Sequence, residues 1–227
     1  MALHYHGLPL TPASLLDLLA GKNVCISYAT ARTSNILWAL RYAQSIMWDN
    51  GAFSIFTQGN GALNPFEFYS WVEPYLGHPH WAVVPDVIDG SIEQQRELTK
   101  TWPFPKDLGA PVWHLGLSMD YLFELIDAWP RVCLGSSGQY WDVGSETWER
   151  RMDEVFNQLA RTRRHMPHLH GLRMLGQLGK RWPLASADSV NVSRNFKSSG
   201  QCPGCMATQI DQVNSPLSWS IQEDLFV

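Results

Sequence analysis

Residues 184–189 read Leu184-Ala185-Ser186-Ala187-Asp188-Ser189, a short run of small and apolar residues that ends on a carboxylate. Such a run is typical of the end of a buried strand. A carboxylate in that position is costly to bury unless it has a partner or a chemical task. A single Asp could equally cap the segment that follows, because Asp is a favoured N-cap residue. One strand of this kind therefore leaves both interpretations open.

The same arrangement occurs twice earlier in the chain. The strand-like run at residues 45–48 leads into Asp49, and Asn50-Gly51 behind it is a strong turn signal. The run at residues 81–85 leads into Asp86, with a second carboxylate three residues further on. Three strand-like runs that each end on Asp favour a chemical role for these carboxylates over capping.

The whole chain alternates strand-like runs with helical patterns. The strand-like runs lie at residues 23–28, 45–48, 81–85, 110–116, 131–134, 168–176 and 184–188. The helical patterns lie at residues 11–20, 34–44, 65–76, 91–101, 118–129 and 145–164. This alternation is the signature of parallel βα units.

The alternation predicts an α/β fold, a compact TIM-type (β/α) barrel, in one domain over residues 1–227. The seven runs are one short of the roughly eight strands of a full barrel, so we expect an irregular or incomplete eighth unit, or one supplied by a terminal segment. An open doubly wound sheet is the alternative, but no Gly-x-Gly-x-x-Gly motif follows the first strand. In a barrel all strands end at one mouth, so the three Asp-bearing ends should converge there with His114 and Gly135–Gly138.

Composition places the chain among globular proteins, with 45% hydrophobic and 17% charged residues. No apolar run reaches the ~18 residues of a membrane span, and no signal-peptide pattern opens the chain. We therefore expect a cytoplasmic protein with no membrane partner. The net charge of −4 argues against a generally cationic nucleic-acid binder, yet residues 145–200 hold ten Lys or Arg against five acids. That region is either a local basic face or a solvated helix whose Arg residues pair with acids.

The four cysteines are too few for a disulfide scaffold. Cys25 and Cys133 lie in strand-like runs, where Cys behaves as a small hydrophobe. Only Cys202-Pro203-Gly204-Cys205 has the spacing of metal ligands. It lies in a C-terminal segment, residues 196–227, that we interpret as a small zinc element or an interface element of a homodimer. Alternatively, the motif is a plain Pro-Gly turn with two free thiols.

Several carboxylates around one pocket cannot all stay charged at low cost. Either a metal holds them, or some are ionised while others are protonated. Mg²⁺ usually needs a phosphate or further carboxylates. If instead some carboxylates are ionised and others protonated, one Asp can attack an electrophilic carbon such as an anomeric C1 while another Asp transfers the proton. A carboxylate also accepts hydrogen bonds from neighbouring ring N–H and amino groups, which suits recognition of a heterocyclic base.

Asp49-Asn50-Gly51-Ala52-Phe53-Ser54 resembles the Asp-Ser-Gly-Gly-Phe-Gln signature of the tRNA-guanine transglycosylases. Four further blocks, in the same order, look like those of the shorter phage and prophage relatives, the DpdA-like family that inserts 7-deazaguanine bases into DNA. These blocks are Pro85-Asp86-Val87-Ile88-Asp89-Gly90, Pro111-Val112-Trp113-His114, Gly135-Ser136-Ser137-Gly138 and Ser186-Ala187-Asp188-Ser189. The resemblance runs from Val24 to Asn195, which is most of the chain.

The resemblance implies a role for each matching position. Asp188 would attack C1′ of the target nucleotide and hold it covalently, and Asp49 would be the general acid and base. The base-binding residues would be Asp86, Asp89, His114 and Phe53, together with Gly135, Ser136 and Ser137 through the backbone of Gly135–Gly138. The residues that hold the sugar-phosphate would be Arg194, Asn195 and Lys197. In a duplex the nucleotide would first leave the stack, aided by aromatic side chains such as those of Phe53 and Trp113.

The chain departs from the tRNA enzymes in three ways. It has only Cys202 and Cys205 where they carry a zinc site of three Cys and one His, so a structural zinc would need His165, His168 or His170 as well. It is shorter, and their RNA-anchoring part is absent, which makes tRNA the less favoured substrate. His114 also stands where they carry Gln, which leaves the identity of the incoming base open.

The resemblance therefore predicts a transglycosylase, a pentosyltransferase that replaces guanine in DNA with a 7-deazaguanine base and needs no cofactor for the chemistry. Its partners would be DNA and that base, in the cytoplasm of a bacterium or a phage-infected host. One alternative is a nucleoside or nucleotide N-glycosidase that uses the same Asp pair and releases the base to water. The other is a purine-binding or nucleic-acid-binding barrel that has lost turnover.

Overall fold

The computed structural model describes residues 2–59, 62–162 and 165–222. All strands of this part form one parallel sheet, in the order β5-β4-β3-β2-β1-β9-β8-β7-β6. The strands are β1 (Leu3–Gly7), β2 (Asn23–Ser27), β3 (Ser45–Asp49), β4 (Trp81–Val83), β5 (Gly109–Ala110), β6 (Val112–His114), β7 (Val132–Gly135), β8 (Leu169–Gly171) and β9 (Ser186–Ser189). The expected parallel α/β barrel is confirmed, and its sheet has one seam, between β5 and β6.

The chain itself crosses this seam. Pro111 alone separates β5 from β6, and proline has no N–H with which to continue a ladder. On one side of it the Val84 main-chain N–H donates to the carbonyl of Ala110 at 2.9 Å. On the other side the Cys133 main-chain N–H donates to the carbonyl of Pro111 at 2.8 Å. The two short strands are therefore one interrupted strand, and with it the sheet goes once round a barrel of the expected strand number.

A terminal segment supplies the strand that the sequence pattern misses. β1 pairs in parallel with β2 on one side and with β9 on the other. Its Tyr5 faces the interior of the barrel, while His4 and His6 are buried on the opposite side. There His6 Nε2 lies 2.9 Å from Asp211 Oδ1, in a C-terminal helix. The sequence pattern misses β1 because His4 and His6 occupy its buried outer face, where an alternating pattern of apolar residues would otherwise indicate a strand.

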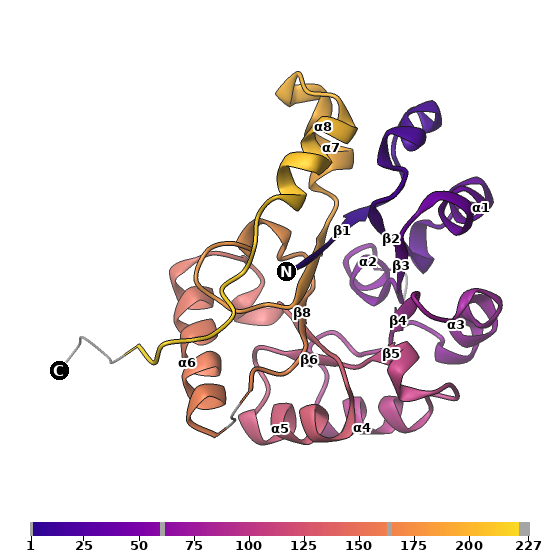
Figure 1. Cartoon of the computed structure of the whole chain (residues 1–227). Coiled ribbons are helices and arrows are strands. Elements are labelled where there is room, and N and C mark those ends of the chain that lie inside the picture. Colours follow the sequence, from indigo (N-terminus) through magenta and orange to yellow (C-terminus); the bar gives the residue numbers. More distant parts are fainter. Residues whose placement is uncertain (1, 60–61, 163–164, 223–227) are drawn as a thin grey trace.

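Helices surround the barrel (Figure 1). The α-helices are α1 (Thr33–Tyr42), α2 (Ala52–Thr57), α3 (Pro65–Val72), α4 (Ile92–Lys100), α5 (Met119–Ala128), α6 (Glu146–Thr162), α7 (Asn191–Ser199) and α8 (Pro203–Asp211). The 3-10 helices are η1 (Ala13–Leu19), η2 (Tyr28–Thr30), η3 (Glu73–Tyr75), η4 (Lys106–Leu108), η5 (Gly138–Tyr140) and η6 (Leu175–Gln177). The main hydrophobic core lies between the outer face of the sheet and these helices, and a second, smaller cluster fills the barrel interior.

Five of the six predicted helices are α-helices, and the first is not. η1 is a 3-10 helix, with main-chain bonds from Leu15 to the carbonyl of Pro12 and from Ala20 to that of Asp17. The sequence pattern also misses α2, α7 and α8. Residues 163–164, at the end of the predicted helix 145–164, lie outside the described residues.

Candidate active site

One layer of side chains lies inside the barrel at the carboxyl ends of the strands. The cluster in the barrel interior contains Cys25, Met47 and Val112. Side chains in a strand alternate between the two faces, so the residues two positions on, Ser27, Asp49 and His114, also point inward. Asp188 joins them from β9, where it is in register with Tyr5, an interior residue of β1. The strand ends that the sequence singles out therefore meet at one mouth.

Asp49, at the end of β3, is a carboxylate with a raised pKa at the mouth. Burial raises its pKa to about 6, and the negative charges of Asp188 and Asp86 add to the rise. Hydrogen bonding from the Ser27 side chain and then from the main-chain N–H of Gly51 acts on the pKa in the opposite direction. Gly51 has a φ of 76°, and a Cβ there would lie 2.8 Å from the main-chain nitrogen of Ala29. Only glycine fits this turn, which brings its N–H back to Asp49.

Asp188 has different surroundings. Its Oδ1 accepts a hydrogen bond from the main-chain N–H of Arg173 at 2.9 Å and lies 3.3 Å from His170 Nε2. The other ring nitrogen of His170, Nδ1, lies 2.8 Å from the hydroxyl of Ser186. Burial lowers the pKa of His170, so the ring is neutral and orients the carboxylate by hydrogen bonding. Among the described residues Oδ2 of Asp188 has no hydrogen-bond donor, which leaves this oxygen free to react.

Asp86 is held by a separate set of partners. Its Oδ1 accepts from the side-chain amide of Asn50 at 2.8 Å, and its Oδ2 lies 2.8 Å from His114 Nε2. His114 Nδ1 in turn lies 3.3 Å from the hydroxyl of Ser137. Asn50 is fixed by two further bonds, to the carbonyl of Val84 and from the N–H of Ala52. The predicted base-binding residues Asp86, His114 and Ser137 thus form one hydrogen-bonded chain at the mouth.

The other predicted base-binding residues are Gly135, on strand β7, and Asp89 and Phe53, which lie outside the strands. Gly135 gives space to His114, since a Cβ there would lie 2.8 Å from Nδ1 of that imidazole. Asp89, with a left-handed φ of 56°, faces Gly138, and Phe53 lies on α2 beside Arg173. These residues border the mouth.

The side chains of Ser136 and Trp113 are directed away from the mouth, which makes the predicted aromatic contact of Trp113 wrong. The Ser136 hydroxyl accepts from Trp148 Nε1 of α6 at 2.9 Å, so this side chain is directed at the helix layer rather than the mouth. Trp113 alternates with the inward-facing Val112 and His114 and is fully buried in the outer core, where its Nε1 donates to the carbonyl of Ser118. The Trp113 side chain therefore cannot contact a base in the mouth. The predicted contact of Ser136 runs through the main chain, and the direction of its side chain does not bear on it.

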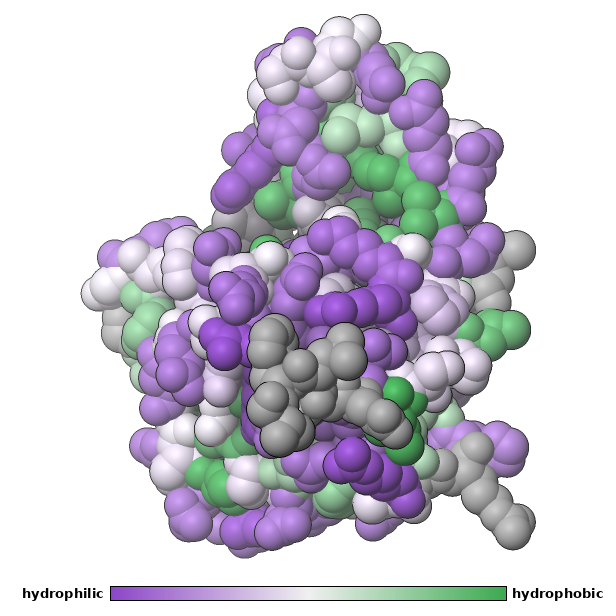
Figure 2. Space-filling view, turned by 90° about the vertical axis from the view of Figure 1, so that its left-hand side faces the viewer, coloured by the Kyte–Doolittle hydropathy of each residue, from purple (hydrophilic) through white to green (hydrophobic). Residues whose placement is uncertain are grey.

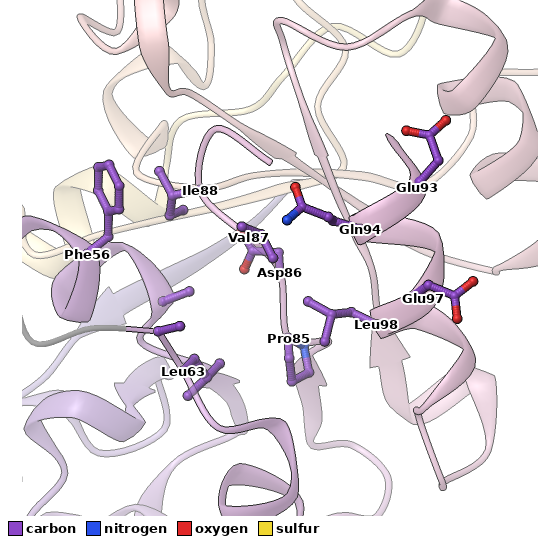
Figure 3. A pocket seen from close by; sticks show the side chains of 12 residues that line it. Phe56, Leu63, Pro85, Asp86, Val87, Ile88, Glu93, Gln94, Glu97 and Leu98 are labelled. Atoms are coloured by element: carbon purple, nitrogen blue, oxygen red, sulfur yellow. The ribbon is translucent and has the colours of Figure 1, made fainter. Parts of the chain in front are cut away.

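A largely apolar pocket of about 460 Å³ adjoins the mouth (Figure 3). It lies between α2, the segment that follows it, the loop after β4 and α4. Its apolar lining includes Phe56, Leu63, Pro85, Ile88 and Leu98. Asp86 is part of the same lining, so the pocket is continuous with the polar chain described above.

The predicted nucleic-acid-binding residues lie on α7, which begins directly after β9. Arg194 and Lys197 are exposed, and the side chain of Asn195 donates to the Asn191 side chain one helical turn earlier. α7 starts at the mouth because it follows the strand that carries Asp188.

Three of the six other described basic residues of this region form ion pairs. On α6 and next to it the ion pairs are Arg150 with Glu146, Arg151 with Glu154, and Arg181 with Glu149 and Asp153. The face of the molecule that carries α6 is predominantly hydrophilic (Figure 2). Arg163 and Arg164 lie outside the described residues. α6 is therefore the solvated helix with paired Arg residues, the second of the two interpretations.

Cys202 and Cys205 form a disulfide at the start of α8. Cys202 is the N-cap, and its Sγ accepts from the main-chain N–H of Cys205 at 3.0 Å. His168 and His170 belong to the barrel wall, and within the described residues no three His, Cys, Asp or Glu side chains are grouped so that they could hold a metal ion. A zinc bound to these sulfurs would first need the disulfide reduced, because the thiolate is the ligand.

Sequence patterns alone miss the groups that orient the carboxylates, His170, Arg173 and Asn50. The alternation of His168-Leu169-His170 in a strand does place both imidazoles on the inner face, which is a signal that could have found His170. Arg173 has no such signal, because its role depends on a loop conformation.

Comparison of the chain with protein-family models, with curated proteins and with solved structures finds no significant match. In the described part of the chain, no helix has both the length and the apolar character that crossing a membrane requires.

Proposed function

We propose that this barrel exchanges a base in nucleic acid: it replaces guanine in DNA with a 7-deazaguanine base through a covalent Asp188-glycosyl intermediate. The observation that carries the proposal is the pair of unlike carboxylates at the mouth. Asp49 has a pKa of about 6 and can carry a proton near neutral pH, whereas Asp188 is held by a main-chain N–H and an imidazole with one oxygen free. Two carboxylates in different environments are the pattern of a nucleophile with a separate acid and base.

In the first step Oδ2 of Asp188 attacks C1′, and the bond from C1′ to N9 of guanine breaks. Protonated Asp49 gives its proton to the leaving guanine, which departs as the neutral base. In the second step ionised Asp49 takes the N9 proton of the incoming 7-deazaguanine. N9 then forms the new bond to C1′, and Asp188 leaves as a free carboxylate. The enzyme returns to its starting protonation state, so a full cycle needs no cofactor.

The Asp86–His114–Ser137 chain is proposed to bind the base. A carboxylate accepts hydrogen bonds well from the adjacent ring N–H and amino group of guanine. Asn50 and His114 hold Asp86 from behind, which keeps it in place for such contacts. The apolar pocket beside Asp86 offers space for the base or its substituent.

An N-glycosidase would use the same Asp pair, with water in place of the incoming base. An exchange experiment separates the two reactions and also tests for a binding protein without turnover. DNA that carries isotopically labelled guanine is incubated with the protein, with and without an added 7-deazaguanine base. RNA and free guanine nucleosides serve as parallel substrates.

The proposal expects labelled guanine to be released from DNA, with the strand keeping a base at every position and gaining the added one. Release of guanine with formation of an abasic site, in the absence of an incoming base, would instead identify a hydrolase. Binding of DNA or purine with no release from any substrate would overturn the proposal and leave a binding protein.

A further inference from the structure

Arg173, in the loop after β8, has an unusual backbone conformation. Its φ of 61° is left-handed, which is costly for a residue with a side chain and persists where the surroundings hold it in place. Two contacts hold it here. Its main-chain N–H donates to Asp188 Oδ1 at 2.9 Å, and its Nη2 donates to the carbonyl of Ser136 at 2.5 Å. The conformation thus fixes one oxygen of the proposed nucleophile and directs the side chain across the mouth.

The guanidinium lies between aromatic side chains rather than beside an acid. Its central carbon is 3.9 Å from the ring centre of Phe53 and 6.0 Å from that of Trp141, which is 60% exposed. Among the described residues no carboxylate lies within ion-pairing distance of it, and the bond to Ser136 uses only part of its donor fork. Burial lowers the pKa of this group, with Asp188 acting in the opposite direction. Because a half-buried charge is costly without a partner, the Arg173 guanidinium is a candidate site for binding an anion.

The position of this cation indicates which anion it receives. A nucleotide whose C1′ faces Asp188 carries its own phosphodiesters a few bonds away, at the rim of the mouth. The guanidinium fork binds phosphate oxygens through two parallel hydrogen bonds, which a lysine cannot reproduce. The guanidinium packs on the Phe53 ring, and this contact limits its rotation.

We propose that Arg173 binds a phosphodiester next to the target nucleotide with its guanidinium and orients Asp188 with its main-chain N–H. This rests on the function proposed above, since it assumes that the mouth receives a nucleic acid. One residue would then couple the presence of the correct backbone to the geometry of the nucleophile.

Arg173→Gly and Arg173→Lys separate these roles. Glycine keeps the left-handed φ and the N–H to Asp188 but removes the fork, while lysine keeps the charge. Affinity for guanine-containing DNA is measured at several salt concentrations, with Arg41→Gln, on the outer helix α1, as the control that removes one exposed charge. We expect roughly tenfold weaker binding for Arg173→Gly and a salt slope smaller by about 0.7–0.9, with partial rescue by lysine. Arg41→Gln should match the wild type.

Neutral methylphosphonates placed 5′ or 3′ of the target guanine identify the phosphate. The wild type should lose affinity for one of the two substituted strands, and Arg173→Gly should bind that strand and the natural one equally. If Arg173→Gly keeps the wild-type salt slope, or remains as sensitive to the substitution as the wild type, Arg173 only pins the loop and the inference is wrong. Binding is measured with Asp188→Asn present in every variant, so that no covalent adduct forms, and a failure of base exchange with these binding results intact counts against the proposed reaction alone.

Discussion

Asp49 and Asp188 lie in the same layer of the barrel, yet the structure gives them different neighbours. Desolvation, together with the negative charges of two other carboxylates, keeps the pKa of the partly exposed Asp49 near 6. Asp188 meets an N–H donor and a neutral imidazole. The different roles proposed for the Asp49 and Asp188 side chains therefore follow from their different environments.

Asp49 also affects stability. Its pKa in the folded protein, about 6, is above the ordinary value of 3.8, so the folded state holds the proton more tightly than the unfolded state. Stability should therefore fall as pH rises from about 4 to about 6, and Asp49→Asn should remove this dependence. We expect Asp49→Asn to be more stable than the wild type by roughly 2 kcal/mol at pH 7.5 and similar to it near pH 4.

Urea unfolding at the two pH values measures this difference. Asp120→Asn, on the exposed surface of α5, is the control and should shift stability by less than ~0.5 kcal/mol at either pH. A wild type at least as stable as Asp49→Asn at pH 7.5 would show that the buried carboxyl is not strained by ionisation.

At the scale of elements, strands that end on Asp were predictable because a short apolar run followed by a carboxylate is visible in sequence. Barrel geometry then brings these ends together without any knowledge of loops. The loops themselves were not predictable: the role of Arg173 depends on one left-handed φ, and that of Ser136 on a contact with α6. α7 and α8 were missed because their sequences are rich in Ser and Asn, or contain Pro and Gly, and their apolar faces are short.

Close packing between strands β6 and β7 makes a prediction at this scale. A Cβ at Gly135 would lie 2.8 Å from His114 Nδ1 and 2.9 Å from Val112 Cγ1, whereas one at Gly116 meets nothing within 4 Å. Gly135→Ala should displace the imidazole from Asp86 and destabilise the protein by about 1–3 kcal/mol. Gly116→Ala is the matched control and should change stability by less than ~0.5 kcal/mol. Equal urea midpoints for the two variants would contradict the packing described for His114.

At the scale of the whole molecule, β1 joins the two halves of the sheet. It is the strand between β2 and β9, and β9 carries Asp188. Its outer face is tied to the C-terminal part of the chain, because Asp211 of α8 pairs with His6 at 2.9 Å and with Lys22 at 2.7 Å. The N-terminal strand and helix α8 thus meet, which the sequence could not reveal because long-range pairing leaves no local pattern.

Deletion of residues 2–7 should therefore abolish cooperative folding rather than weaken it. Without β1, two strands become unpaired edges and the interior loses Tyr5. Leu3→Ala, at a side chain that is 38% exposed, should retain a cooperative transition close to that of the wild type. A cooperative urea transition in the deletion variant, followed by circular dichroism, would show that the barrel does not depend on this strand.

The covalent role of Asp188 is tested most directly by intact mass. The wild type, Asp188→Asn and Asp49→Asn are each incubated with a guanine-containing DNA strand, denatured and weighed. We predict that the wild type gains the mass of the strand without its guanine, that an added 7-deazaguanine base removes this adduct, and that Asp188→Asn never forms it. Asp49→Asn should form it far more slowly, because the leaving guanine then has no acid. An adduct of equal yield in Asp188→Asn, or none in the wild type while DNA is bound, would contradict the account.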